Sequence, residues 1–321
     1  MSVFITDYIS KPDLESQILS GAITDNKEVA EVLLVWHQKI DEAYLKQFPN
    51  LKGIVRYGVG FDMVDFDAVK EKGVVFCNTP DYGTDEVSDT AIAMIMNIAR
   101  GVTRYDYFCR DYQNGSWQEN TLNDIKRTSS QVLGVLGAGR IGGSVLRKSK
   151  ALGFQTVFFD PYRDSGHEKM LGVSRVSSLN KLLSISDIVS IHTPLTEETI
   201  GMVSEEFVFK MKDGASLINT ARGEIISNLD IFIEPLKSGK MRGLGLDVLP
   251  NEPPINCELI QSWTDREAWI DGKVIINPHT SYYSQESYEE MRIKASKNAK
   301  RIIDGQLPEN ILIEGKVNHS L

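Results

Sequence analysis

The feature that most restricts the fold of this chain is the run Gly-Ala-Gly-Arg-Ile-Gly at residues 137–142. It directly follows an apolar run at residues 132–136, and residues 140–152 behind it have the composition of a helix. In that setting GxGxxG is typical of the strand-turn-helix unit that binds a dinucleotide. The first glycine permits the tight turn, the second lets the pyrophosphate approach the backbone, and the third lets helix and sheet pack closely.

The cofactor predicted from this motif is NAD. Backbone N–H groups at the start of the helix would hold its phosphates. Asp160 ends the next apolar run, where an acidic residue hydrogen-bonds the ribose hydroxyls and disfavours the 2′-phosphate of NADP. Arg163 lies close to Asp160 in sequence and leaves NADP open as an alternative.

The fold class follows from the alternation of apolar runs with helix-like segments. At about 150 residues per domain, a chain of 321 residues predicts two domains. The alternation itself is typical of β-α-β units and parallel sheets. The expected strands lie at residues 3–5, 32–36, 54–57, 74–77, 132–136, 156–160, 188–192, 215–219, 244–248 and 274–276. Those from residue 132 onward suffice for a doubly wound sheet of about six or seven strands.

The residue composition changes at Thr84. Residues 84–100 are rich in Ala, Ile and Met and contain neither Pro nor Gly. Thr84 provides a hydroxyl cap, and acidic residues follow it in the first turn. We therefore expect one long helix over residues 84–100, with its continuation toward Tyr112 left open, and we expect its apolar stripe to serve core or interdomain packing.

The composition excludes several kinds of partner. The chain has 35 Lys and Arg against 44 Asp and Glu, a net charge of -9, so it lacks the basic footprint for nucleic acid and suits anionic membranes poorly. Three cysteines form no CxxC pair and suit a reducing compartment, and five scattered histidines offer no metal-ligand cluster. Neither a signal peptide nor a run of about 20 apolar residues is found. We expect a soluble cytoplasmic protein without a metal.

Three polar segments each follow an expected strand. They are residues 219–223 (Asn-Thr-Ala-Arg-Gly), residues 247–254, and residues 277–280 (Asn-Pro-His-Thr). In open α/β sheets, ligands bind at the carboxyl ends of the strands. These segments therefore mark a candidate site.

Arg222, Glu252 and His279 in these segments suit hydride transfer between a 2-hydroxy acid and a 2-oxo acid. An arginine holds a carboxylate or a reacting oxygen through its fork of donors. A histidine accepts or supplies the hydroxyl proton. A carboxylate beside the histidine fixes its tautomer and stabilises its protonated form. Taken singly, each also has a less favoured structural interpretation: a surface or phosphate-contacting arginine, a loop-ending glutamate and a structural histidine.

With these motifs the sequence resembles the D-2-hydroxyacid dehydrogenase family over nearly its whole length, from residues 56–62 (Arg-Tyr-Gly-Val-Gly-Phe-Asp) to residues 277–279 (Asn-Pro-His). It is most similar to the bacterial branch that resembles the C-terminal binding proteins of animals. The segments that carry this similarity are residues 54–56, 85–89, 159–162 and 283–286.

The resemblance implies two Rossmann-like, doubly wound parallel-sheet domains with a cleft between them. Residues 1–101 and 284–321 would form the substrate domain, and residues 102–283 the NAD-binding domain inserted into it. The chain would cross between the domains near Gly101 and near Ser284. The long helix from Thr84 would bridge the domains and contribute to a homodimer interface.

Residue roles follow from the resemblance, position by position. Arg222 would bind the substrate and polarise its carbonyl, His279 would be the acid/base, and Glu252 would be its partner. The other expected substrate contacts are Arg56, Val59, Gly60 and Tyr282. The expected cofactor contacts are Thr84, Gly137, Gly139, Arg140, Ile141, Gly142, Asp160, Thr193, Pro194, Thr199, Ala221 and Asp247, the last two near the nicotinamide.

Three positions depart from the family pattern. Met63 stands where relatives often have Asn, and Gly83 where a Ser often contacts the cofactor phosphate. Tyr282 replaces a Trp that packs on substrate in the animal proteins. An aromatic wall at that position sets the shape of the pocket, so the identity of the substrate stays open.

The expected function is NAD-dependent reduction of a small 2-oxo acid. One alternative is an NAD-responsive dimer that recruits partners, as the animal relatives do. Another is chemistry like that of S-adenosylhomocysteine hydrolase, which needs a considerably longer chain. Substrates left open are glyoxylate, hydroxypyruvate, pyruvate, branched and aromatic 2-oxo acids, and the pair of 3-phosphoglycerate and 3-phosphohydroxypyruvate. Arg56 and Arg222 are the only cations expected at the cleft, which favours an uncharged tail.

Overall fold

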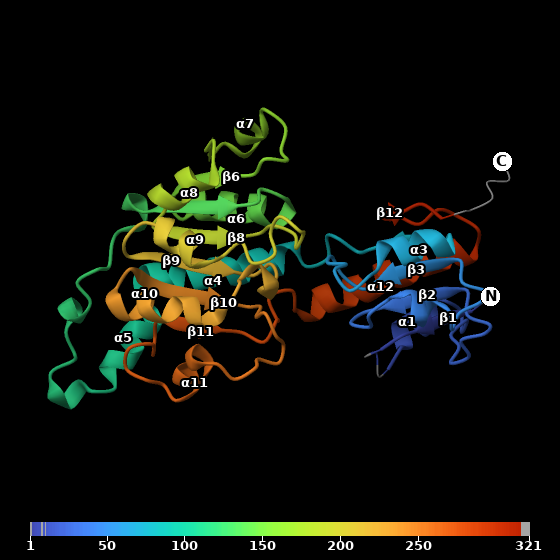
Figure 1. The fold of residues 1–321 in the computed structure, drawn as a ribbon, viewed down its shortest axis with the longest axis horizontal. Coiled ribbons are helices and arrows are strands. Elements are labelled where there is room, and N and C mark those ends of the chain that lie inside the picture. Colours follow the sequence, from blue (N-terminus) through green and yellow to red (C-terminus); the bar gives the residue numbers. More distant parts are fainter. Residues whose placement is uncertain (1, 8, 10, 316–321) are drawn as a thin grey trace. The chain divides into compact units, whose positions relative to one another are not determined.

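The computed structural model describes residues 2–7, 9 and 11–315, so the ends of the predicted substrate-domain segments, residues 1 and 316–321, lie outside the described residues. The chain forms two compact units (Figure 1). One consists of residues 1–83 together with residues 283–321, and the other of residues 84–282. The second unit is therefore an insertion within the first.

The first unit is built on a sheet with the strand order β1-β2-β3-β4-β12 in the part of the chain that is described. Its strands are β1 (Val3–Ile5), β2 (Val32–Val35), β3 (Gly53–Arg56), β4 (Val75–Cys77) and β12 (Ile311–Ile313). The first four are parallel, whereas β12 runs antiparallel to β4. The sequence analysis did not predict this antiparallel edge strand.

Helices of the first unit pack its N-terminal segment against its C-terminal segment. They are α1 (Asp13–Ile18), α2 (Glu42–Leu45), α3 (Phe66–Lys72) and α12 (Gln285–Ile303). Helices α1 and α12 pack on each other, and α12 also lies against β2 and β3. The fully buried Glu15 carboxylate accepts hydrogen bonds from Arg292 Nε at 2.8 Å and Nη2 at 2.5 Å, and from the Tyr57 hydroxyl at 3.2 Å. This buried ion pair fastens the N-terminal part of the unit to its C-terminal helix.

The second unit contains, within the described ranges, a seven-stranded parallel sheet with the order β11-β10-β9-β8-β5-β6-β7. Its strands are β5 (Val132–Leu136), β6 (Gln155–Phe159), β7 (Ser174–Arg175), β8 (Ile188–Ile191), β9 (Ala215–Asn219), β10 (Met241–Leu246) and β11 (Val274–Ile276). This sheet confirms the prediction of six or seven strands. The order reverses between β5 and β8, which is the switch point where such sheets bind ligands.

Helices of the second unit cover both faces of that sheet (Figure 1). They are α4 (Thr84–Arg100), α5 (Val102–Cys109), α6 (Arg140–Ala151), α7 (His167–Leu171), α8 (Leu179–Ile185), α9 (Glu205–Lys210), α10 (Ile233–Ser238) and α11 (Glu258–Thr264). Short 3₁₀ turns among the described residues are η1 (Tyr112–Asn114), η2 (Glu119–Thr121), η3 (Thr128–Ser130), η4 (Gly223–Ile225) and η5 (Leu229–Phe232).

The long helix predicted from Thr84 to Arg100 is confirmed, but it does not continue toward Tyr112 as one helix. Helix α4 ends at Arg100, and Gly101 adopts the left-handed conformation, with φ at 64°. A Cβ at Gly101 would lie 2.7 Å from the Ile125 side chain. The position between the two helices therefore requires glycine, both for its left-handed backbone and for this close contact.

The boundary expected near Gly101 lies instead at Gly83, because α4 packs on α6, β9 and β10 of the second unit. Its apolar stripe, which includes Met94, Ile95 and Ile98, is buried in the core with strands of that sheet. The stripe thus serves core packing, one of the two uses expected for it.

Candidate active site

Three neighbouring strands bring the predicted catalytic segments to one edge of the sheet. Strands β9, β10 and β11 are hydrogen-bonded neighbours, and the polar segments follow their carboxyl ends. The loop after β9 also touches the loop after β10, since a Cβ at Gly223 would lie 1.9 Å from the backbone of Leu249. Glycine is needed at this position because the two backbones approach so closely.

His279 and Glu252 form a direct pair across this edge. The Nδ1 of His279 lies 2.7 Å from Oε2 of Glu252, and Glu252 Oε1 accepts the backbone amide of Leu249 at 2.9 Å. Both carboxylate oxygens are thus engaged, which fixes the orientation of the carboxylate. Because Nδ1 faces Glu252, the Nε2 atom of the ring is the one left for a reacting group.

The ionisation of Glu252 follows from its neighbours. Burial alone would raise the pKa of this carboxyl. The hydrogen bond and charge of His279, the amide of Leu249 and the charge of Arg222 outweigh burial and hold the pKa below its usual value. Glu252 is therefore a carboxylate at neutral pH and an acceptor for the imidazole N–H.

Arg222 is positioned by a turn that depends on Asn219. The fully buried Asn219 side chain accepts the amide of Ala221 at 3.0 Å and donates to the carbonyl of Arg222 at 2.9 Å. The Arg222 guanidinium donates to the carbonyl of Ala221 at 2.7 Å. Sequence reasoning placed Asn219 in the motif without giving it a role. The position of Asn219 at the end of a predicted buried strand was the sequence signal that could have indicated this role.

Tyr282 lies in the loop that follows β11 and carries His279, here called the histidine loop, and Asp247 lies beside this loop. The ring of Tyr282 stands edge-on to the imidazole of His279, with centroids 6.5 Å apart and planes at 80°. The carboxylate of Asp247 is buried and accepts hydrogen bonds from the backbone amides of Thr280 and Ser281. The structure therefore groups Tyr282 and Asp247 with the predicted acid/base.

The glycine-rich loop fits a dinucleotide. Gly137 has φ at 87°, and a Cβ there would lie 2.8 Å from the carbonyl of His192. A Cβ at Gly142 would lie 1.9 Å from the carbonyl of Gly137, so the loop and α6 approach too closely for any side chain. At Gly139 the space is open, with the Arg163 guanidinium 3.5 Å away as its nearest neighbour. No described side chain caps the start of α6, which leaves its first amides for phosphate.

Asp160 is hydrogen-bonded to the backbone of the glycine-rich loop. The side chain is buried, its Oδ2 accepts the amide of Ala138 at 2.8 Å, and its Oδ1 accepts the amide of Tyr162 at 2.9 Å. Arg163 Nε lies 3.2 Å from Oδ2. The hydroxyl of Tyr162 donates to Glu198, which joins the loops after β6 and β8 on either side of the glycine-rich loop.

Two of the buried polar atoms without a hydrogen-bond partner among the described residues lie in the loop after β8. Thr193 Oγ1 and His192 Nδ1 both have no hydrogen bond there. Burial lowers the pKa of His192 to about 3, so this ring is neutral. The nearby Thr199 hydroxyl instead donates to the carbonyl of Pro194 at 2.7 Å. Unpartnered polar atoms beside the glycine-rich loop are what a site for a polar ligand requires, and the residues present thus fit NAD.

The predicted substrate contacts Arg56, Val59 and Gly60 lie in the first unit, at the carboxyl end of β3. Arg56 is buried, and its guanidinium fills the space beside Gly58, where a Cβ would lie 1.9 Å from Nη1. The side chain of Asn78 donates to the carbonyl of Val59 at 2.7 Å. The loop at residues 58–60 is thus a braced backbone turn.

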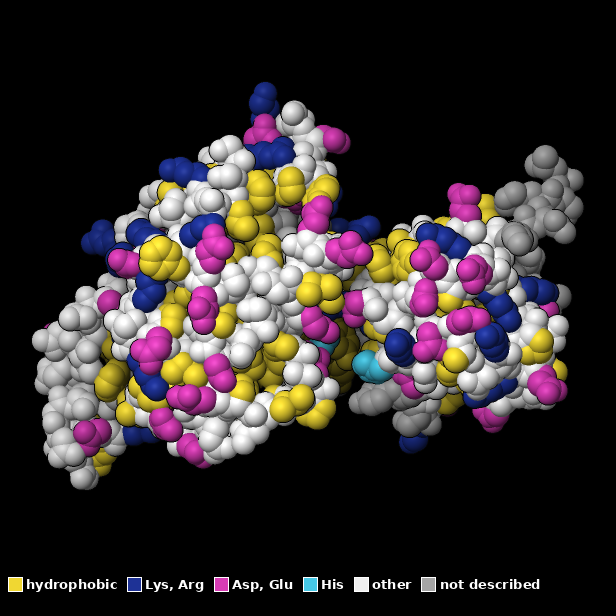
Figure 2. All heavy atoms as spheres, viewed as in Figure 1, with side chains coloured by type: hydrophobic (Ala, Val, Ile, Leu, Met, Phe, Trp, Pro, Cys, Tyr) yellow, Lys and Arg dark blue, Asp and Glu magenta, His cyan; other side chains and the backbone are white. Residues whose placement is uncertain are grey.

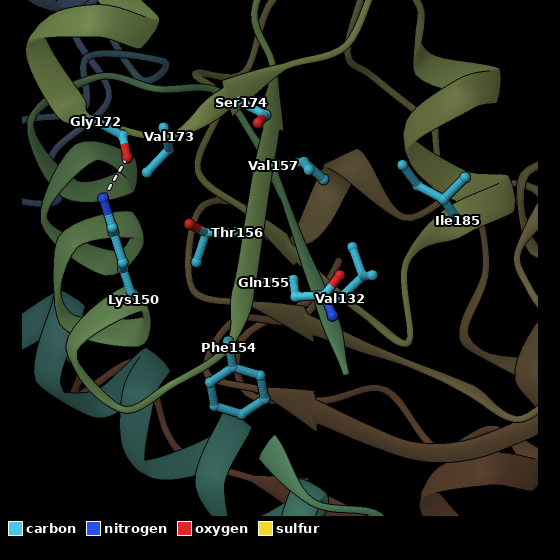
Figure 3. Close-up of a pocket in the computed structure, with 10 residues that line it drawn as sticks. All are labelled: Val132, Lys150, Phe154, Gln155, Thr156, Val157, Gly172, Val173, Ser174 and Ile185. Carbon is cyan, nitrogen blue, oxygen red and sulfur yellow. Dashed lines mark hydrogen bonds between the residues drawn. The ribbon is translucent and has the colours of Figure 1, made fainter. Parts of the chain in front are cut away.

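The opposite edge of the second sheet carries a hollow of about 530 Å³ that is separate from these groups. It is lined in part by the first residues of β5, β6 and β7 (Figure 3). Beside it, the Lys150 ammonium donates a hydrogen bond to the carbonyl of Gly172 at 2.5 Å. Within the described ranges, no helix is long and apolar enough to cross a bilayer, and no three His, Cys, Asp or Glu side chains gather as metal ligands.

A doubly wound unit with this loop, and with a histidine-carboxylate pair at the same sheet edge, defines an NAD-binding dehydrogenase. Residues 92–281 match the family described as D-isomer specific 2-hydroxyacid dehydrogenase, NAD binding domain. The chain belongs to the D-isomer-specific 2-hydroxyacid dehydrogenase family. It is therefore an NAD-dependent oxidoreductase, as the resemblance implied.

Two relatives are named as glyoxylate reductases. The one from Thermococcus litoralis is 31% identical over 295 residues, which cover 89% of this chain and 84% of that protein. The one from Korarchaeum cryptofilum is 33% identical over 275 residues, covering 85% and 79%.

Two solved structures are also similar. The D-lactate dehydrogenase of Aquifex aeolicus in complex with NAD and lactic acid is 29% identical, with a TM-score of 0.80 and coverage of 95% and 96%. The D-mandelate dehydrogenase of Rhodotorula graminis is 26% identical, with a TM-score of 0.83 and coverage of 98% of each chain.

Proposed function

We propose that this protein reduces a small 2-oxo acid with an uncharged tail, using Arg222, Glu252 and His279. The observation that carries the proposal is the 2.7 Å contact between His279 and Glu252 at the sheet edge that also holds Arg222. Glyoxylate, hydroxypyruvate and pyruvate are the substrates tested first. The names of the two curated relatives favour a short substrate tail.

Each residue has a distinct role in this reaction. The chemistry that the bound cofactor supplies is donation of a hydride to the carbonyl carbon. Arg222 holds the substrate and polarises its carbonyl through charged N–H donors. His279 gives the proton on Nε2 to the carbonyl oxygen, and the Glu252 carboxylate stabilises the imidazolium before this transfer. In the oxidative direction, His279 takes the hydroxyl proton as the hydride leaves.

The carboxyl edge of the second sheet would hold the cofactor in this proposal. The amides of the glycine-rich loop would hold its pyrophosphate, and Asp160 would hydrogen-bond the adenosine ribose. The contacts assigned to it are Thr84, Gly137, Gly139, Arg140, Ile141, Gly142, Asp160, Thr193, Pro194, Thr199, Ala221 and Asp247.

The substrate carboxylate meets the backbone amides of Val59 and Gly60, with Arg56 in support. The braced turn at residues 58–60 supports this assignment, since fixed amides bind an anion without having to be ordered first. Tyr282 forms an aromatic wall beside the imidazole of His279.

The experiment is oxidation of NADH near neutral pH against a panel of 2-oxo acids, with His279→Ala as the comparison. We expect turnover of at least one short 2-oxo acid and a loss of about 10²- to 10⁴-fold in the variant, with NADH binding retained. Equal turnover by the variant would show that His279 is not the acid/base. NADH binding without turnover of any panel member would support the recruitment alternative.

We further propose a homodimer in the cytoplasm. The family resemblance supports the dimer, and the three free cysteines support a reducing compartment. On the face in view in Figure 2, acidic and basic side chains are mixed, in keeping with a small-molecule substrate and no nucleic-acid partner. Light scattering after size-exclusion chromatography tests the dimer, and a monomeric mass would contradict it.

A further inference from the structure

The new inference concerns Asp247, which directly follows β10 between the strands that lead to Arg222 and to His279. Its amide donates to the carbonyl of Asn219 at 3.0 Å, and its own carbonyl accepts the amide of His279 at 2.8 Å. The residue is 1% exposed. Asp247 thus joins the backbone segments that carry both predicted catalytic side chains.

Its carboxylate closes on the same histidine loop. Oδ1 accepts the amide of Thr280 at 2.9 Å and that of Ser281 at 3.1 Å, and Oδ2 also lies 3.1 Å from the Ser281 amide. Three consecutive amides, at residues 279–281, therefore donate to this one residue. Hydrogen bonds to a buried carboxylate are among the strong ones, so the loop is firmly held.

The backbone of His279 explains why the loop requires such a clamp. Its φ is 55°, in the left-handed region that residues with a Cβ rarely adopt. A residue keeps such a conformation only where its surroundings impose it. The hydrogen bonds that impose it here come from Asp247, directly to residue 279 and to the two residues after it.

We propose that Asp247 is a positioning residue for His279, and that its carboxylate sets the imidazole against Glu252 and the substrate. The inference deepens the proposed function and rests on His279 being the acid/base. It gives Asp247 a role distinct from contact with the nicotinamide, because the hydrogen bonds described here run to backbone amides of the histidine loop.

Two substitutions separate geometry from charge. Asn keeps the Oδ1 acceptor that both amides share and replaces only the Oδ2 acceptor of Ser281 with an NH2 group, whereas Ala removes both oxygens. We expect Asp247→Ala to lose about 10²-fold in kcat, the scale set by a small misplacement of a catalytic group, and Asp247→Asn to lose clearly less. Asp213→Asn is the matched control, since that carboxylate is 91% exposed and pairs with Lys240 on the surface of the same unit.

The measurements are kcat, KM for the 2-oxo acid, the Kd of NADH by fluorescence, and the melting temperature. The decisive comparison places Asp247→Ala in the His279→Ala background. If Asp247 acts through the imidazole, it costs no further activity there, whereas a merely structural role would cost as much as in the wild type.

Three outcomes would overturn the inference. These are an unchanged kcat in Asp247→Ala, a loss confined to the Kd of NADH, and a folded Asp247→Asn as inactive as His279→Ala. The last comparison holds even if Asp247→Ala fails to fold. Absence of turnover by the wild type would instead contradict the proposed function, so the two failures are distinguishable.

Discussion

Glu252 bonds with one carboxylate oxygen to the imidazole of His279 and with the other to the backbone amide of Leu249. The first contact crosses 27 residues of sequence, and the second lies within its own loop. Glu252 thereby connects the loops that follow β10 and β11. A change at Glu252 should alter the orientation of the histidine as well as its protonation.

Glu252→Gln tests this relationship at nearly constant size. The amide lacks the charge that stabilises the imidazolium, so we expect kcat to fall by about 10²-fold. The Kd of NADH should change little, because Glu252 is not among the residues assigned to the cofactor. Steady-state kinetics and NADH fluorescence measure both quantities. Glu258→Gln on α11 is the control, since that side chain is 63% exposed and pairs only at the surface with Lys237; equal losses in the two variants would contradict the role of Glu252.

Asp160→Ala should weaken NAD binding and relax discrimination against NADP, because the carboxylate that repels the 2′-phosphate is removed. Asp160 also accepts the amide of Ala138, so the alanine variant disturbs the loop itself. Asp160→Asn removes the charge and keeps one acceptor oxygen for the Ala138 or Tyr162 amide, so it disturbs the loop less than alanine does. The ratio of kcat/KM for NADH and NADPH in the two variants separates these effects. An unchanged ratio in both would show that the ribose is recognised elsewhere.

Arg292→Met should destabilise the first unit by about 3–5 kcal/mol, because it leaves the buried Glu15 carboxylate without its cation. Denaturation in urea measures the loss. On the same helix, Lys294→Met removes a partly exposed cation that pairs with Asp81 and Glu290, and we expect less than about 1 kcal/mol. Similar losses in the two variants would rule out a special contribution from the buried pair.

Asp187 predicts a pH dependence of stability in the second unit. Burial alone would raise the pKa of this carboxyl, but hydrogen bonds from Lys212 and the Val132 amide, and the charges of Lys212 and Lys126, hold it below its usual value. A lowered pKa in the folded state stabilises the fold above the pKa of the unfolded carboxyl, about 4, and this contribution is lost as pH falls through the folded pKa.

Asp187→Asn should therefore cost about 1–3 kcal/mol near pH 7. The difference from the wild type should shrink as pH falls below about 4, where the carboxyl itself becomes protonated. Urea denaturation at several pH values measures this. A difference that stays constant down to acid pH would show that the charge of Asp187 does not contribute.

The sheet of the second unit and the grouping of the candidate site were predictable from sequence for a local reason. Each apolar run ends in a polar segment, and neighbouring parallel strands bring those segments to one edge. Arg222, Glu252 and His279 lie along that edge because they follow β9, β10 and β11.

The features that were missed depend on contacts between distant residues. The break at Gly101 reflects packing against Ile125, and the clamp by Asp247 depends on amides at residues 280 and 281. Backbone amides carry no side-chain signature, so no pattern of residue types could have indicated that role. The left-handed backbone of His279 could not be predicted either, because the hydrogen bonds that impose it also involve backbone amides.

The ion pair between Glu15 and Arg292 also has a consequence for synthesis of the chain. The two residues are 277 positions apart, and everything between residues 84 and 282 leaves the ribosome before α12 does. The inserted unit is contiguous and carries its own sheet and core, so it can fold while translation continues. The first unit is complete only when Arg292 arrives to cover the carboxylate of Glu15. Until then its N-terminal half is exposed to chaperones and proteases.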